Sequence, residues 1–128
     1  PRTISSQVRH IDFMPTILEM LDIPINTSFE KLDGKSLMPI INGQNISEEF
    51  AFSETGNPLN EKAPPKTPNT KSIRNSKWKL IHNEHDNTKE LYDLENDPGE
   101  ENNLIGKNFE IEKELSKELL KYTNDQNC

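Results

Sequence analysis

The segment 13–21 constrains the fold most, because it combines a helical pattern with apolar side chains on almost every side. Asp12 precedes the segment and Pro15 follows three positions later, which is typical of a helix start with Asp12 as its cap. Thr16 and Glu19 form its narrow polar stripe. A helix that is apolar nearly all round needs cover on several sides. The sequence therefore predicts a helix that must pack against a large apolar surface.

The rest of the chain offers little apolar material for that purpose. Only 30% of the 128 residues are hydrophobic and 29% are charged, whereas a globular domain is roughly 45–50% apolar when glycine is counted. We therefore infer that part of the helix packs against protein outside this chain. The alternative is a small α+β domain that buries the helix by itself.

The charge pattern excludes some partners and suggests another. A net charge of −7 argues against a general nucleic-acid or anionic-membrane binder, and the sequence has no apolar run of about 18 residues that could span a membrane. Between residues 62 and 83, however, there are six basic residues and no acidic one. These are Lys62, Lys66, Lys71, Arg74, Lys77 and Lys79. Such an island could attract a small anion, or its lysines could protect a sheet edge.

Three further elements are expected along the chain. A short helix is predicted over 37–41, ending at Asn42-Gly43. Alternating apolar and polar residues predict a small antiparallel sheet over about 48–94, and a closing helix is predicted over 109–122. Its apolar stripe consists of Ile111, Leu115, Leu119 and Tyr122.

No catalytic or metal-binding residue can be assigned within the chain. His82 and His85 lie near a hairpin end and would point to opposite faces of a strand, which disfavours a metal site. Cys128 is the only cysteine, so it cannot form an internal disulfide, and it has no neighbouring base. His10 beside Asp12 could be drawn as a base and its partner, but helix capping explains Asp12 better.

Five segments nevertheless occur in a recognisable order. Residues 8–18, with the sequence VRHIDFMPTIL, resemble the segment that follows the catalytic region in sulfatases of the alkaline-phosphatase superfamily. Residues 33–43 resemble the next element of these enzymes, and segments 72–74, 77–81 and 90–104 resemble their C-terminal strands and closing motif. The resemblance spans most of the chain, and the ordered set is more specific than any single piece.

This resemblance implies an α+β fold: the end of a large α/β domain, followed by a four-stranded antiparallel sheet with a packed C-terminal helix. Residues 1–47 would end the catalytic domain, and 48–128 would form the C-terminal subdomain. The implied reaction is sulfate-ester hydrolysis with formylglycine and calcium. The C/S-x-P-x-R motif and the metal ligands of these enzymes have no matching positions here, so the chain alone is expected to be inactive.

The resemblance also implies a place for substrate. Loops of the small sheet border the active site in similar enzymes, so Lys62, Lys66 and Lys71 are our candidate rim for a sulfated small molecule or polysaccharide. The implied partner is the N-terminal catalytic region. A periplasmic or extracellular location is favoured, with the cytoplasm as the alternative. Two other functions stay open: a phosphonate monoester or phosphodiester hydrolase, and a non-catalytic module that binds anions or polysaccharides.

Overall fold

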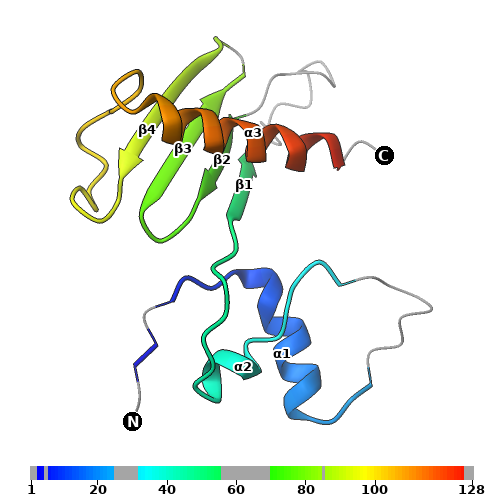
Figure 1. Ribbon diagram of the computed structural model, residues 1–128. Coiled ribbons are helices and arrows are strands. Elements are labelled where there is room, and N and C mark those ends of the chain that lie inside the picture. The colour runs from blue at the N-terminus through cyan, green and yellow to red at the C-terminus, as the bar shows by residue number, and fades with distance from the viewer. Residues whose placement is uncertain (1–2, 5, 25–31, 56–69, 85, 126–128) are drawn as a thin grey trace. The chain divides into compact units, whose positions relative to one another are not determined.

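The computed structural model describes residues 3–4, 6–24, 32–55, 70–84 and 86–125. The chain divides into two compact units, 1–49 and 50–128, and each is described by itself. Unit 1 contains the 3-10 helix η1 (His10–Asp12) and the helices α1 (Phe13–Met20) and α2 (Met38–Ile41). Unit 2 contains β1 (Ala51–Thr55), β2 (Thr70–Arg74), β3 (Trp78–Asn83), β4 (Thr88–Asp93) and α3 (Phe109–Asp125) (Figure 1). The boundary expected from the sequence, between residues 47 and 48, separates the catalytic domain of a longer enzyme from its C-terminal subdomain. It stays a prediction.

The predicted cap of the first helix is wrong, because Asp12 has a different role. Its backbone is already helical (φ −81°, ψ −14°) and its side chain makes no capping bond, since η1 runs directly into α1. A capping residue needs a non-helical backbone. The carboxylate of Asp12 instead accepts hydrogen bonds from Arg9 Nη2 at 2.8 Å and from the backbone amide of Lys35 at 3.0 Å.

Two buried polar side chains join α1 to the segment that leads into α2. Asp12 makes the first connection through Lys35. Thr16 makes the second: its hydroxyl donates to the Asp12 carbonyl at 2.5 Å and accepts from the Leu37 amide at 2.9 Å. Asp12 and Thr16 are only 4% and 6% exposed. Because these hydrogen bonds are shielded from water, they define how the two segments of unit 1 pack.

Much of the apolar surface of α1 lies exposed. Phe13, Met14, Ile17 and Met20 are 49%, 58%, 53% and 62% exposed, whereas Thr16 on the same helix is buried. This agrees with the sequence-based inference that the chain cannot cover this helix. An exposed apolar patch of this kind is typical of a surface that another protein segment covers.

The buried carboxylate of Asp12 gives the first prediction. Burial alone would raise the pKa of Asp12, but hydrogen bonds from Arg9 and from the Lys35 amide outweigh it and lower the pKa. The ionised Asp12 carboxylate therefore stabilises unit 1 fully above the unfolded-state pKa of about 4. This stabilisation is lost as the pH falls through the lower pKa that Asp12 has in the folded state. We expect Asp12→Asn to destabilise unit 1 by about 2–3 kcal/mol.

The measurement is the hydrogen-exchange protection factor of the Lys35 amide at pH 5 and below pH 3. In the unsubstituted protein the Lys35 amide should be protected at pH 5 and lose protection below pH 3, whereas in Asp12→Asn protection should be low at both pH values. Asp33→Asn, at an exposed position of the same segment, is the matched control and should resemble the unsubstituted protein. Equal protection in all three proteins would contradict the assigned role of Asp12.

Unit 2 is the predicted antiparallel sheet with a helix on one face. The strand order is β1-β2-β3-β4, and α3 crosses one face of the sheet (Figure 1). The register places Ile73, Leu80 and Leu91 side by side on three strands, and all three are fully buried against Leu115 and Leu119 of α3. The predicted apolar stripe of the closing helix is thereby confirmed.

Side-chain hydrogen bonds organise the segment after β4. The Asp93 carboxylate accepts from Asn96 Nδ2 at 2.9 Å, and the Asp97 carboxylate accepts from the backbone amides of Glu101 and Asn102 at 3.1 and 2.8 Å. These bonds favour the charged form and lower the pKa of both carboxyl groups. A hydrogen bond from the Glu100 amide to the Asp97 carbonyl, at 3.1 Å, closes a turn in the same segment.

No helix in the described part of the chain is long and apolar enough to cross a membrane.

Candidate functional site

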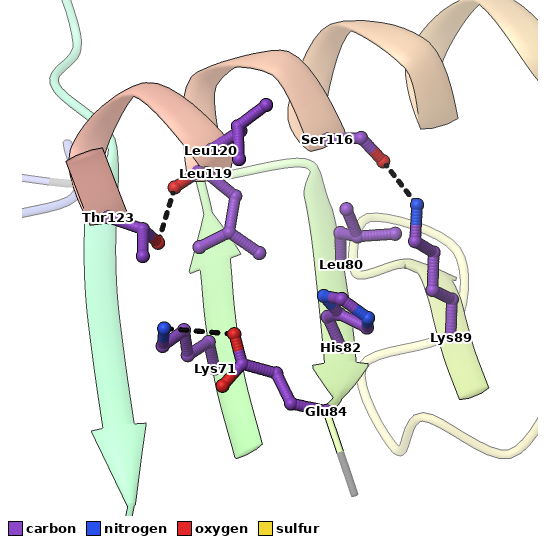
Figure 2. A pocket seen from close by; sticks show the side chains of 9 residues that line it. All are labelled: Lys71, Leu80, His82, Glu84, Lys89, Ser116, Leu119, Leu120 and Thr123. Carbon is purple, nitrogen blue, oxygen red and sulfur yellow. Dashed lines mark hydrogen bonds and ion pairs between the residues drawn. The ribbon is translucent and has the colours of Figure 1, made fainter. Parts of the chain in front are cut away.

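Unit 2 has a pocket of about 230 Å³ between its sheet and the C-terminal half of α3. Figure 2 shows the charged side chains and His82 on the sheet side, and two leucines and two hydroxyl-bearing side chains of α3 on the other. Leu120 contributes an exposed apolar side chain, and Ser116 and Thr123 contribute hydroxyl groups. The pocket therefore combines apolar and hydrogen-bonding groups.

Three nitrogen-bearing side chains form a row across the floor of this pocket. Lys71 of β2 lies directly opposite His82 of β3, and His82 lies directly opposite Lys89 of β4. Because side chains alternate along a strand, His82 shares the helix-facing side with Leu80 and Glu84. The registers of β2 with β3 and of β3 with β4 therefore bring Lys71, His82 and Lys89 to one place (Figure 2).

The two lysines of the row have different partners. Lys71 Nζ lies 2.9 Å from Glu84 Oε1, and the Lys71 side chain is 13% exposed. Lys89 Nζ donates to the hydroxyl oxygen of Ser116 on α3 at 3.2 Å. His82 Nε2 lies 3.1 Å from Asn87 Oδ1. A carboxylate thus balances the charge of Lys71, whereas the bonded partner of Lys89 is neutral.

Of the candidate rim residues, the structure locates one. Lys71 lies on β2 in the pocket, while Lys62 and Lys66 lie outside the described residues. The rim therefore stays a prediction. The described lysines of the basic island are bound to acidic side chains: besides Lys71, Lys77 pairs with Glu95 at 2.8 Å and Lys79 with Glu100 at 2.6 Å.

The described residues do not assemble a metal site. Among them, no group of three or more histidine, cysteine, aspartate or glutamate side chains is placed to hold an ion. His82 bonds Asn87, and His85 and Cys128 lie outside the described residues. The donor set of this part of the chain therefore does not fit calcium, and we assign no step through a metal to these residues.

The described chain thus consists of a four-stranded antiparallel sheet covered by α3 and of a unit whose helix α1 has an exposed apolar side. The chain belongs to the family described as N-sulphoglucosamine sulphohydrolase, C-terminal, whose profile matches residues 1–125. This confirms the resemblance of the sequence to the C-terminal portion of sulfatases and its α+β fold. A search of curated proteins finds no match.

Solved structures share this fold. One is that of BT4656 in complex with its substrate D-glucosamine-2-N,6-O-disulfate, with 27% identity and a TM-score of 0.68, covering 88% of this chain and 23% of that one. A second is BT1596, a 2-O GAG sulfatase, with 25% identity and a TM-score of 0.62, covering 88% and 23%.

A third is the phosphonate monoester hydrolase of Agrobacterium radiobacter, with 22% identity and a TM-score of 0.68, covering 89% of this chain and 24% of the other. At this identity the likeness shows the fold alone. The chain thus spans about a quarter of the length of these structures.

Proposed function

We propose that this chain is the C-terminal portion of a sulfatase that hydrolyses sulfate esters. The observation that carries the proposal is the family match over residues 1–125. It is supported by similarity to a protein solved with a disulfated glucosamine as its substrate and to a 2-O GAG sulfatase. A sulfated sugar is accordingly the proposed substrate class.

The exposed side of α1 supports the same proposal from physical grounds. The side chains of Phe13, Met14, Ile17 and Met20 are each about half exposed or more, and burying one such side chain contributes about 1.5–3 kcal/mol. We propose that the catalytic α/β region of the enzyme covers this surface and contains the reacting groups. The partner of this chain is then a further region of the same enzyme.

The proposed cofactors are calcium and formylglycine, as in the sulfatases this chain resembles. Both would be held by residues outside the chain, since its described residues offer no suitable donor set. In such enzymes calcium is the electrophilic metal, and formylglycine supplies the nucleophile. We propose a periplasmic or extracellular location on the same resemblance.

The direct test is turnover by the natural polypeptide that contains residues 1–128. A sulfated glucosamine is assayed beside the matched phosphonate monoester and phosphodiester, and residues 1–128 alone are assayed in parallel. We expect the highest kcat/KM for the sulfate ester and no turnover by residues 1–128 alone. Activity of residues 1–128 alone, or no esterase activity in the natural polypeptide, would contradict the proposal.

The second candidate is a phosphonate monoester or phosphodiester hydrolase. It is favoured by the shared fold with the enzyme from Agrobacterium radiobacter. A sulfate monoester and a phosphate diester both carry one negative charge, so the lysines of the chain do not discriminate between them. A higher kcat/KM for the phosphorus esters in the same assay would select this candidate.

The candidate rim gives a separate prediction. In the natural polypeptide, replacing Lys62, Lys66 and Lys71 with glutamine should lower kcat/KM for an anionic ester, because positive charge near a site raises the association rate of anions. The difference from the unsubstituted enzyme should shrink as salt screens the charges. Replacing Lys113, Lys117 and Lys121 of α3 with glutamine removes the same charge and serves as the control. Equal effects of both sets would refute the rim.

A further inference from the structure

The row Lys71–His82–Lys89 places one ammonium group on each side of the His82 imidazole, on three adjacent strands. Glu84 supplies a negative charge at Lys71. Among the described residues, the bonded partner of Lys89 is the uncharged hydroxyl group of Ser116.

Lys89 differs in this respect from the other lysines at the sheet. Lys71, Lys77 and Lys79 each contact a glutamate at 2.9 Å or less. Acidic residues outnumber basic residues in the chain. A shortage of carboxylates therefore does not explain why Lys89 bonds a hydroxyl group. The position is therefore suited to an additional anion that enters the pocket.

We propose that this pocket binds an oxyanion, a sulfate or carboxylate group carried on a sugar, with Lys89 as its principal contact. The oxyanion completes the charge balance of the row Lys71–His82–Lys89. The exposed side chain of Leu120 lines the same pocket and contacts the C–H groups of the ring. The choice of a sugar as the carrier rests on the proposed function, whereas the charge argument does not.

The hydroxyl groups of α3 fit this ligand. Ser116 accepts the hydrogen bond from Lys89, so its own proton is available to a ligand oxygen. Lys89 on the sheet and Ser116 on α3 thus give the pocket two hydrogen-bond donors for an oxyanion.

Ligand-dependent hydrogen exchange in the natural polypeptide tests the proposal. The probes are N-acetylglucosamine 6-sulfate, glucuronate, sodium sulfate and the neutral N-acetylglucosamine. We expect the two anionic sugars to protect peptides of β3, β4 and α3. Lys89→Gln should weaken their binding at least about tenfold, because a hydrogen bond to a charged group is lost. Lys89→Arg should retain binding, and Lys113→Gln, which removes the same charge from the exposed side of α3, should not change it.

Three results would overturn the proposal. These are no protection of the pocket peptides by any anion, equal protection by the neutral sugar, and unchanged binding in Lys89→Gln. Equal protection by sodium sulfate alone would overturn the sugar as carrier. Because this readout needs no turnover, a pocket that fails to bind is distinguishable from an enzyme that fails to hydrolyse sulfate esters.

Discussion

Replacing Leu80 with alanine is expected to lower the stability of the sheet by about 2–5 kcal/mol. Leu80 is fully buried at the centre of the core of unit 2, between Ile73 and Leu91 in register and beneath Leu115. Its truncation removes apolar contacts and leaves a cavity that the three paired strands cannot close by moving. Native-state hydrogen exchange of the β3 and β4 amides measures the change.

The matched control is Leu120→Ala on α3. Leu120 is 62% exposed, so the same truncation should change the stability by less than about 0.5 kcal/mol. Equal losses for Leu80→Ala and Leu120→Ala would show that the sheet and α3 do not share the core described here.

Gly34→Ala is expected to have the second large effect, in unit 1. A Cβ atom at Gly34 would lie 1.9 Å from the carbonyl oxygen of Ile11, far inside a van der Waals contact, and that oxygen belongs to the backbone of η1. The chain must therefore move away, which separates Lys35 from Asp12. We expect a cost of about 3 kcal/mol or more, at the upper end for overpacking.

The measurement for Gly34→Ala is the protection of the Lys35 and Leu37 amides, which bond Asp12 and Thr16. Both should lose protection. Gly99→Ala is the matched control, because its added Cβ would meet only the flexible side chain of Glu101 at 3.4 Å. Full protection of both amides in Gly34→Ala would refute the close packing of these segments.

Local patterns predicted the secondary structure well, because they depend on neighbouring residues. Period-two alternation located the sheet, and a helical stripe located the buried side of α3, with Leu115 and Leu119 in the core. The role of Asp12 was missed, since capping depends on the backbone conformation that η1 imposes. The contact of Gly34 with Ile11 was missed as well, because it joins segments that are distant in the sequence.

The sequence predicted the candidate site incompletely for the same reason, because its contacts join segments that are distant in the sequence. The run of lysines suggested a free positive surface, but Glu95 and Glu100, from outside the run, pair with Lys77 and Lys79. Charge summed along a segment does not reveal partners that the fold supplies. Lys89 lies outside the run and was not singled out. The signal that could have found it is strand register, which places Lys89 opposite His82.

The central claim is that the apolar side of α1 is covered by protein outside this chain. The most direct measurement is the rate of methionine oxidation by peroxide, followed by mass spectrometry, in residues 1–128 alone and in the natural polypeptide. Met14 and Met20 lie in this surface, and the partly buried Met38 is the internal reference. We predict fast oxidation of Met14 and Met20 in residues 1–128 alone and strong protection in the natural polypeptide. Equally fast oxidation in both would contradict the account.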